Sequence, residues 1–290
     1  MVKIISDSTC DLSPELVNRY DIDILPLHIL LGEKEYKDGK NITPDEIFAW
    51  SDAHKTTPKT SAPSLVDAIE ILKPYVEEKR EVICFSISSS MSTSGNVMRL
   101  AADELEASDF VTVIDSANLS TGIGLQVVEA AVMAQAGKSA AEIKKILTDQ
   151  KLDSSIYITL DTLKYLKKGG RITPAAAAIG TVLNLKPVLQ IQGEKLDAYA
   201  KVRGKKQAKR AMLKAMKNDW ETRFKEYASD GEMCLQAAYT GNLEEAEEFK
   251  KEIQEVFPGM EIHMDPLSLS VACHIGYGAL AVACSRKVTL

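Results

Sequence analysis

The sequence predicts an α/β protein with two α/β domains, the first built on a doubly wound, mainly parallel sheet and the second on a mixed sheet with helices. In the first half, short apolar runs alternate with capped helical patterns, which is typical of parallel strands joined by helices. In the second half, strand-like runs at 188–191 and 196–200 flank a turn signal at 192–195, which indicates a hairpin beside helices. We place the domains at residues 1–152 and 153–290.

Each element of the first half has a local signal. The expected strands are short apolar runs, and Pro26 interrupts the second of them. These strands cover residues 2–6, 22–31, 81–86 and 110–114. The expected helices follow Ser or Thr caps, often with proline or an acidic residue in the first turn. They begin after Ser13, Thr43, Ser64 and Ser139, and two more cover residues 95–106 and 121–135.

The second half of the sequence differs from the first in that it predicts a basic turn and longer helices. A strand at 156–160 precedes the basic turn at 163–171, and Thr173-Pro174 then starts an Ala-rich helix that runs to residue 183. Further strands are expected at residues 233–239 and 261–264. Further helices are expected at residues 205–224, 243–256 and 279–284.

Composition excludes several classes of protein. The 290-residue chain carries a net charge of −6, whereas a general nucleic-acid binder is usually basic. We expect no transmembrane segment, because no uninterrupted apolar stretch of about 20 residues occurs. Five scattered cysteines without a C-x-x-C pair, and an N-terminus without a signal-peptide pattern, favour reduced thiols in a cytoplasm. No paired-histidine motif supports a metal site, so we expect no metal.

The most informative segment is the serine-rich loop at residues 88–94. It lies between the strand at 81–86 and a helix, where hydroxyls and the free N–H groups of a helix start favour an oxyanion. Two other polar segments, at residues 6–9 and 115–116, also follow expected strands. Because parallel strands end at one edge of a sheet, we expect the three segments to converge there.

Basic residues form two groups in this acidic chain. Residues 201–217 contain eight Lys or Arg and no acid, and four more basic residues occur between 164 and 171. Such a run is either a solvated helix face or a docking surface for an acidic partner or a phosphorylated group. Arginine suits bidentate phosphate contacts, which makes Arg171 and Arg203 the candidates. His274 is a further candidate, in a glycine-containing turn before the expected helix at 279–284.

Eight short motifs occur in order along nearly the whole chain. They are Ser6-Asp7-Ser8-Thr9, Tyr36-Lys37-Asp38-Gly39, Thr60-Ser61-Ala62-Pro63-Ser64, residues 88–96, Asp115-Ser116, residues 163–172, Arg203-Gly204-Lys205-Lys206 and His274-Ile275-Gly276. Taken together, the motifs resemble the DegV family, fatty-acid-binding proteins that serve bacterial fatty-acid kinase.

The resemblance implies a lipid carrier without catalytic activity of its own. A long-chain fatty acid would lie in a tunnel between the domains, with no other cofactor. A fatty-acid kinase subunit would phosphorylate the carboxylate for phospholipid synthesis, and transient contact with a membrane surface is compatible with this role. The carboxylate would be bound by Thr60, Ser92 and the backbone at Ser61 and Thr93, with His274 nearby. Arg171 and Arg203 would face the kinase.

The chain departs from the family pattern at two places. Where the family has L-S-G-T-Y, this sequence reads Met91-Ser92-Thr93-Ser94-Gly95, so a β-branched residue stands where glycine is usual. Where the family has H-x-G-P-G, this sequence has Tyr277 in place of proline. We expect Thr93 to restrict the backbone, and Tyr277 to shorten or block the pocket or to add a hydroxyl to it.

Two other functions remain open from the sequence. A serine hydrolase would use Ser92 or Ser94 with His274 and either Asp7 or Asp115, although no G-x-S-x-G motif is present. A phosphate- or nucleotide-binding protein is suggested by the glycines of residues 121–124, although no Walker lysine follows them.

Overall fold

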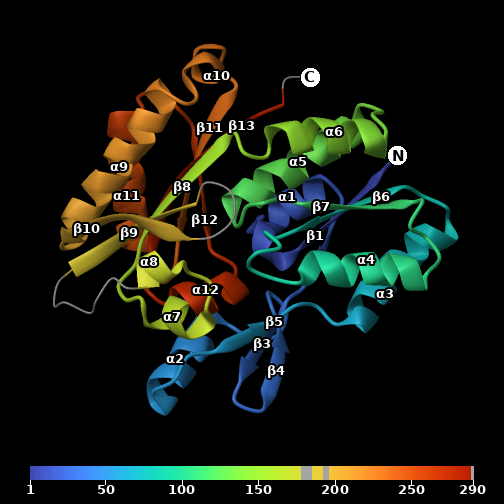
Figure 1. Cartoon of the computed structure of the whole chain (residues 1–290), viewed down its shortest axis with the longest axis horizontal. Helices are drawn as coiled ribbons and strands as arrows, with labels where there is room; N and C mark the ends of the chain where they lie inside the picture. Colours follow the sequence, from blue (N-terminus) through green and yellow to red (C-terminus); the bar gives the residue numbers. More distant parts are fainter. Residues whose placement is uncertain (178–184, 192–195, 289–290) are drawn as a thin grey trace.

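The computed structural model describes residues 1–177, 185–191 and 196–288, and this part of the chain forms three β-sheets (Figure 1). The parallel sheet has the order β2-β1-β6-β7, and all its neighbouring strands are parallel. Its strands are β1 (Lys3–Asp7), β2 (Ile22–Leu25), β6 (Val82–Ser86) and β7 (Val111–Asp115). The predicted doubly wound parallel sheet is therefore confirmed.

The mixed sheet has the order β10-β9-β8-β13-β11-β12. Only the pair β11 and β12 is parallel among its described strands; the other neighbours are antiparallel. Its strands are β8 (Ser154–Thr159), β9 (Leu185–Ile191), β10 (Asp197–Arg203), β11 (Met233–Tyr239), β12 (Ile262–Pro266) and β13 (Leu280–Arg286). The predicted mixed sheet of the second half is confirmed.

Helices cover both large sheets, and one helix packs between them. Helices α3 (Leu65–Glu77) and α4 (Ser94–Glu104) bury one face of the parallel sheet, whereas α5 (Thr121–Gln135) packs on its other face. The opposite side of α5 packs against β13, so one apolar cluster joins the two sheets. The outer face of the mixed sheet is buried by α9 (Lys205–Glu221) and α11 (Leu243–Val256).

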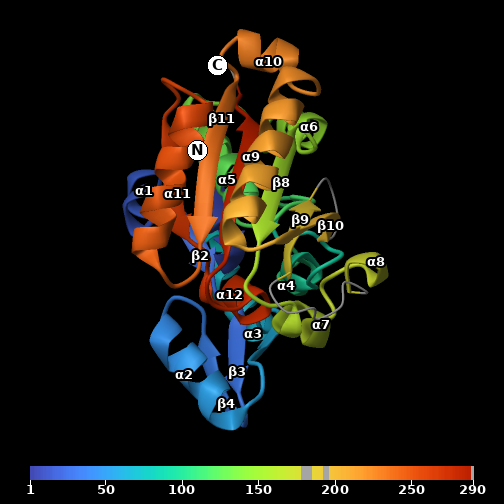
Figure 2. The same ribbon diagram turned by 90° about the vertical axis from the view of Figure 1, so that its left-hand side faces the viewer.

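The small sheet lies at the lower end of the molecule in Figures 1 and 2. It is antiparallel, with the order β4-β3-β5. The sheet packs against α2 and α12 around a small apolar cluster. These elements are β3 (His28–Leu31), β4 (Lys34–Lys37), β5 (Lys59–Ser61), α2 (Pro44–His54) and α12 (Leu269–Ile275).

Capping residues set the helix starts as the sequence predicts. Thr43 begins α2 with a capping box, in which its hydroxyl accepts the N–H of Glu46 and the Glu46 carboxylate accepts the N–H of Thr43. Ser139 does the same for α6 (Ala140–Gln150). Ser13 caps α1 (Pro14–Arg19), which has proline at its first position.

Three predictions about local structure are wrong. The helix predicted at 279–284 is the strand β13 (Leu280–Arg286), because burial between α5 on one face and α9 and α11 on the other removes the alternation that marks a strand. The basic turn at 163–171 contains the helix α7 (Lys164–Gly169). His274 lies in helix α12, where a turn was expected.

Residues 22–31 form two strands in different sheets, because the chain changes direction at Pro26. The Ala-rich helix is described only as α8 (Pro174–Ala177). Its remainder, and the predicted turn at 192–195, lie outside the described residues. Within the described part of the chain, no helix combines the length and the apolar character needed to cross a membrane.

Candidate functional site

A cavity of about 470 Å³ opens where the parallel sheet, the small sheet and α12 meet. Hydroxyl groups line one part of its wall and apolar side chains line the rest. Its lining residues are Thr9, Leu27, Thr60, Ser61, Ala62, Ile87, Ser89, Ser90, Met91, Ser92, Thr93, Leu119, Leu166, Gly170, Arg171, Leu196, Ser270, Val271, His274 and Ile275. The cavity therefore collects all five residues predicted to bind the carboxylate, together with Arg171, whereas Arg203, the other residue predicted to face the kinase, does not line it.

The serine-rich loop contributes the largest share of the polar wall. It turns tightly after β6, because the N–H groups of Met91 and Ser92 both donate to the carbonyl of Ser88, at 2.9 and 3.2 Å. The hydroxyl oxygen of Ser92 accepts the N–H of Ser94, the first residue of α4, at 3.2 Å. This contact occupies an acceptor position and leaves the Ser92 hydroxyl proton free to donate. The loop thus presents a hydroxyl donor beside a helix N-terminus.

Thr60 and His274 form the opposite polar wall. The Thr60 hydroxyl lies 2.7 Å from His274 Nε2, although 214 positions separate the two residues. Burial, and then the charge of Arg171, lower the pKa of His274 to about 4. The imidazole is therefore neutral near pH 7. A neutral ring that donates from Nε2 to Thr60 Oγ1 leaves the threonine proton free for an acceptor in the cavity.

Arg171 connects the serine-rich loop to α7. Its Nε donates to the carbonyl of Met91 at 3.2 Å, and its Nη1 donates to the carbonyl of Gly169. Gly169 also makes room for the imidazole, since a Cβ there would lie 2.2 Å from Nδ1 of His274. Arg171 thus brings a positive charge to the cavity edge while its donors hold the serine-rich loop to the end of α7.

A second, apolar pocket adjoins the cavity and shares four lining residues with it: Leu119, Leu196, Val271 and Ile275. It extends toward the mixed sheet, where Ala238, Ala281 and Ala283 contribute small side chains. Its volume is only about 20 Å³, so the pocket is nearly closed. The cavity therefore borders a small apolar pocket that lies between it and the mixed sheet.

The three polar segments that follow parallel strands converge, as predicted. Asp7, at the end of β1, accepts the N–H of Ile87 at 2.9 Å, and Asp115, at the end of β7, accepts the N–H of Ser89 at 3.3 Å. Asp7 also accepts the N–H of Thr9. Burial raises the pKa of Asp7, against the opposing effect of these hydrogen bonds. Asp7 therefore fixes the residue just before the serine-rich loop, and Asp115 fixes a residue of the loop itself.

The contacts do not favour the two other functions considered from the sequence. Among the described contacts, the hydrogen-bond partner of His274 is Thr60, and neither Asp7 nor Asp115 contacts the imidazole as a catalytic triad requires. The glycines of residues 121–124 are needed for packing. A Cβ at Gly124 would lie 2.6 Å from the carbonyl oxygen of Cys10.

Comparisons with known proteins agree with this architecture. The model of the DegV family matches residues 1–287. A DegV domain-containing protein of Deinococcus radiodurans is 31% identical over 285 residues, which cover 97% of each chain. The chain belongs to the DegV family.

Solved structures of the family are similar over their whole length. A stearic acid-binding protein from Eubacterium ventriosum superposes with a TM-score of 0.89 at 29% identity, over 99% of each chain. A fatty-acid-binding DegV-family protein from Thermus thermophilus gives 0.86 at 29% identity, over 98% of this chain and 99% of that one. The mixed α/β fold of this DegV-family chain is therefore that of structures known to bind fatty acids.

The two departures from the family motifs leave the cavity intact. Thr93 has φ −92° and ψ 12°, a conformation open to a β-branched residue, so the backbone does not require glycine there. Gly95 is needed instead, because a Cβ would lie 2.6 Å from the hydroxyl of Ser86. Tyr277 lines neither pocket, contrary to expectation; it is half exposed and packs edge-on against Phe48.

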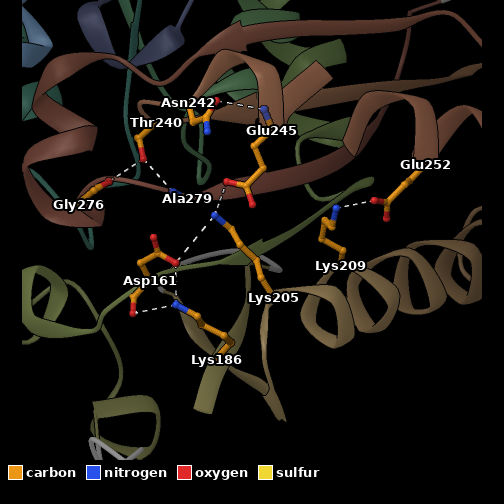
Figure 3. Close-up of polar contacts among 10 residues, drawn as sticks. All are labelled: Asp161, Lys186, Lys205, Lys209, Thr240, Asn242, Glu245, Glu252, Gly276 and Ala279. Carbon is orange, nitrogen blue, oxygen red and sulfur yellow. Dashed lines mark hydrogen bonds and ion pairs between the residues drawn. The ribbon is translucent and has the colours of Figure 1, made fainter. Parts of the chain in front are cut away.

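The basic run at residues 201–217 is partly neutralised by acidic neighbours (Figure 3). Lys205 lies 2.6 Å from Glu245 and 3.9 Å from Asp161, and Lys209 pairs with Glu252. Arg203, at the end of β10, is exposed and lies outside the cavity lining. The run thus combines a paired inner side with exposed cations such as Arg203.

Two buried carboxylates near the cavity were not predicted as functional. Asp11 accepts the N–H of Ser268 at 2.9 Å, and Asp38 accepts the N–H groups of Leu269 and Ser270 at 3.0 and 3.1 Å. Burial raises the pKa of Asp11 to about 7. The only sequence signal for Asp38 is its motif, Tyr36-Lys37-Asp38-Gly39. Both carboxylates act at the N-terminal end of α12.

Asp11→Asn should change how stability depends on pH. Because the folded-state pKa of Asp11 is raised, the folded protein binds more protons than the unfolded chain between about pH 4 and 7, and stability falls as pH rises through that window. The amide mimics the neutral carboxyl, so the variant should gain stability relative to wild type by at most about 1.4 kcal/mol per pH unit. Urea unfolding of both proteins across this pH range measures the difference in the free energy of unfolding. Exposed Asp149→Asn is the control, and parallel curves for D11N and wild type would contradict the prediction.

Proposed function

We propose that this protein binds a long-chain fatty acid and presents its carboxylate to a fatty-acid kinase for acyl-phosphate formation in phospholipid synthesis. The observation that carries the proposal is a cavity with hydroxyl groups on its wall, bordered by a nearly closed apolar pocket that extends toward the mixed sheet. We take this pocket as the apolar path of the acyl chain. The fatty-acid-binding relatives of the same fold support it. In this proposal the path runs between units at residues 1–152 and 153–290.

The carboxylate would be held by neutral donors. With His274 protonated at Nε2, the hydroxyl protons of Ser92 and Thr60 are both available to the cavity, and Ser61 and Thr93, whose backbone N–H groups would assist, also line it. Hydrogen bonds from such donors to an ionised group are shorter and stronger than neutral ones. A neutral His274 behind Thr60 would orient that hydroxyl, and the nearby charge of Arg171 would favour an anion.

The acyl chain would occupy the apolar path. Each buried methylene contributes about 0.8 kcal/mol, so a long chain supplies most of the affinity. Because the inner pocket is nearly closed, the chain would have to displace side chains around Val271 and Ile275 of α12 on entry. The acyl tail should therefore determine the affinity, and the polar wall should determine the orientation of the bound fatty acid.

The kinase would approach from the surface that carries exposed cations. Arg203 is exposed and makes no ion pair with the described residues, so its guanidinium is available to an acidic partner or a phosphate. Arg171 lies at the cavity edge, nearer the carboxylate. The protein itself would supply binding and orientation, and the kinase would supply the phosphoryl transfer.

Lipid extracted from the purified protein should contain a fatty acid of defined chain length. Mass spectrometry of the extract gives the identity, and native mass spectrometry of the intact protein gives the stoichiometry. Protein stripped of lipid should bind an added fatty acid again. If no fatty acid copurifies and none binds when added, the carrier function is wrong.

Ser92→Ala should weaken fatty-acid binding by roughly 1–3 kcal/mol, about 5- to 150-fold in Kd, because a donor to a buried charge is lost. Isothermal titration with lipid-free protein measures the affinity. Ser108→Ala, at an exposed serine bonded to Asp103, is the control and should bind as wild type does. Equal affinities of S92A and wild type would remove Ser92 from the site.

Arg203→Ala should leave fatty-acid binding unchanged and slow phosphorylation of the bound lipid by the kinase. Its exposed position outside the cavity is the reason for this separation. Arg210→Ala, at an exposed arginine of the same basic run, tests whether the effect is specific to position 203. A parallel loss of lipid binding and phosphorylation in R203A would instead indicate a structural role.

A further inference from the structure

Asp38 is a buried carboxylate that lies outside the cavity yet connects the two elements that form one wall of it. The residue is only 3% exposed. One carboxylate oxygen accepts the N–H of Leu269, and the other accepts the N–H of Ser270 and the hydroxyl of Ser8. All three donors come from other elements. The carboxylate therefore joins the small sheet to the start of α12 and to the short helix η1 (Ser8–Cys10).

The position of α12 depends on such contacts. With seven residues it is too short to be stable in isolation, and its first N–H groups have no partner within the helix. Asp38 satisfies two of these groups, and its negative charge also suits a helix N-terminus. Loss of the carboxylate would leave buried N–H groups without an acceptor, so α12 would shift or fray at its start.

The three hydrogen bonds that the Asp38 carboxylate accepts, here called the Asp38 clamp, bear directly on the Thr60–His274 pair. Thr60 lies in β5 of the small sheet, and Asp38 is anchored to that sheet by its own N–H, which donates to the carbonyl of Leu27 at 2.9 Å. His274 lies on α12. The distance of 2.7 Å between the Thr60 hydroxyl and His274 Nε2 thus spans the two elements that Asp38 holds together.

We propose that Asp38 is a positioning residue of the carboxylate site: by fixing the start of α12 against the small sheet, it sets the Thr60–His274 contact. The inference rests on the proposed fatty-acid function, because that contact matters only if a carboxylate binds there. Asp38 itself touches no ligand in this arrangement, since it does not line the cavity.

Asp38→Asn is the test, because the amide keeps the shape and directs a donor at one of the N–H groups. In lipid-free protein, NMR titration should show the pKa of His274 rising from about 4 toward its ordinary value, as the imidazole becomes hydrated. Affinity for palmitate should fall roughly tenfold, whereas affinity for hexadecanol, which has the same tail and no carboxylate, should change less than about twofold.

Asp219→Asn is the matched control. Asp219 is likewise buried, at 4% exposed, and accepts hydroxyls of Ser155 and Tyr157 at 2.6 and 2.7 Å, but it lies outside the cavity. The variant should lose stability without changing the His274 titration or the ratio of palmitate to hexadecanol affinity. If D38N does not fold, Ser8→Ala removes one donor to Asp38 instead. This variant should change the pKa of His274 and the ratio of palmitate to hexadecanol affinity in the same direction as D38N, but by a smaller amount.

A double variant provides the decisive comparison. If Asp38 acts through the pair, D38N combined with Thr60→Ala should bind palmitate no more weakly than T60A alone. The proposal is overturned if D38N leaves the His274 titration unchanged or weakens the binding of palmitate and of hexadecanol equally. It is also overturned if the effects of D38N and T60A on palmitate affinity are additive. Failure of wild-type protein to bind any fatty acid overturns the proposed function instead, and the lipid-free His274 titration still tests the clamp.

Discussion

The candidate site depends on buried carboxylates that bind backbone N–H groups. Asp7 binds the N–H of Ile87 at the start of the serine-rich loop, while Asp11 and Asp38 bind N–H groups at the start of α12. Among the described residues, no salt bridge joins these three carboxylates to a Lys or Arg, and burial raises the pKa of each. A buried carboxylate is costly unless it is hydrogen-bonded, so each of the three favours the position of the backbone segment that it binds.

This construction suits a ligand that must be held and yet remain reactive. Hydroxyl and N–H donors fixed before binding lose little entropy when a carboxylate arrives. Arg171 donates from Nε and Nη1 to the carbonyls of Met91 and Gly169, so these two contacts fix the guanidinium while its charge acts on the cavity.

Much of the fold follows from local signals in the sequence. Caps at Ser13, Thr43 and Ser139 fix helix starts, because each replaces a missing intrahelical partner with its own side chain. The strand β13 could not be recognised in this way. It is central in its sheet and buried on both faces, so its apolar run carries no alternation. The small sheet was missed because β4 and β5 are short and partly exposed.

The candidate site likewise has one part that the sequence predicts and another part that it does not. The serine-rich loop is visible in the sequence because side chains of one kind make up its polar wall, and the resemblance to relatives adds Thr60 and His274, whose contact spans 214 positions. The clamp by Asp38 acts on the backbone N–H groups of residues 269 and 270, which lie 231 and 232 positions away in the sequence. Any residue except proline supplies that donor, so no pattern at the start of α12 can reveal it. Contacts between a side chain and a distant backbone therefore become visible only in the folded structure.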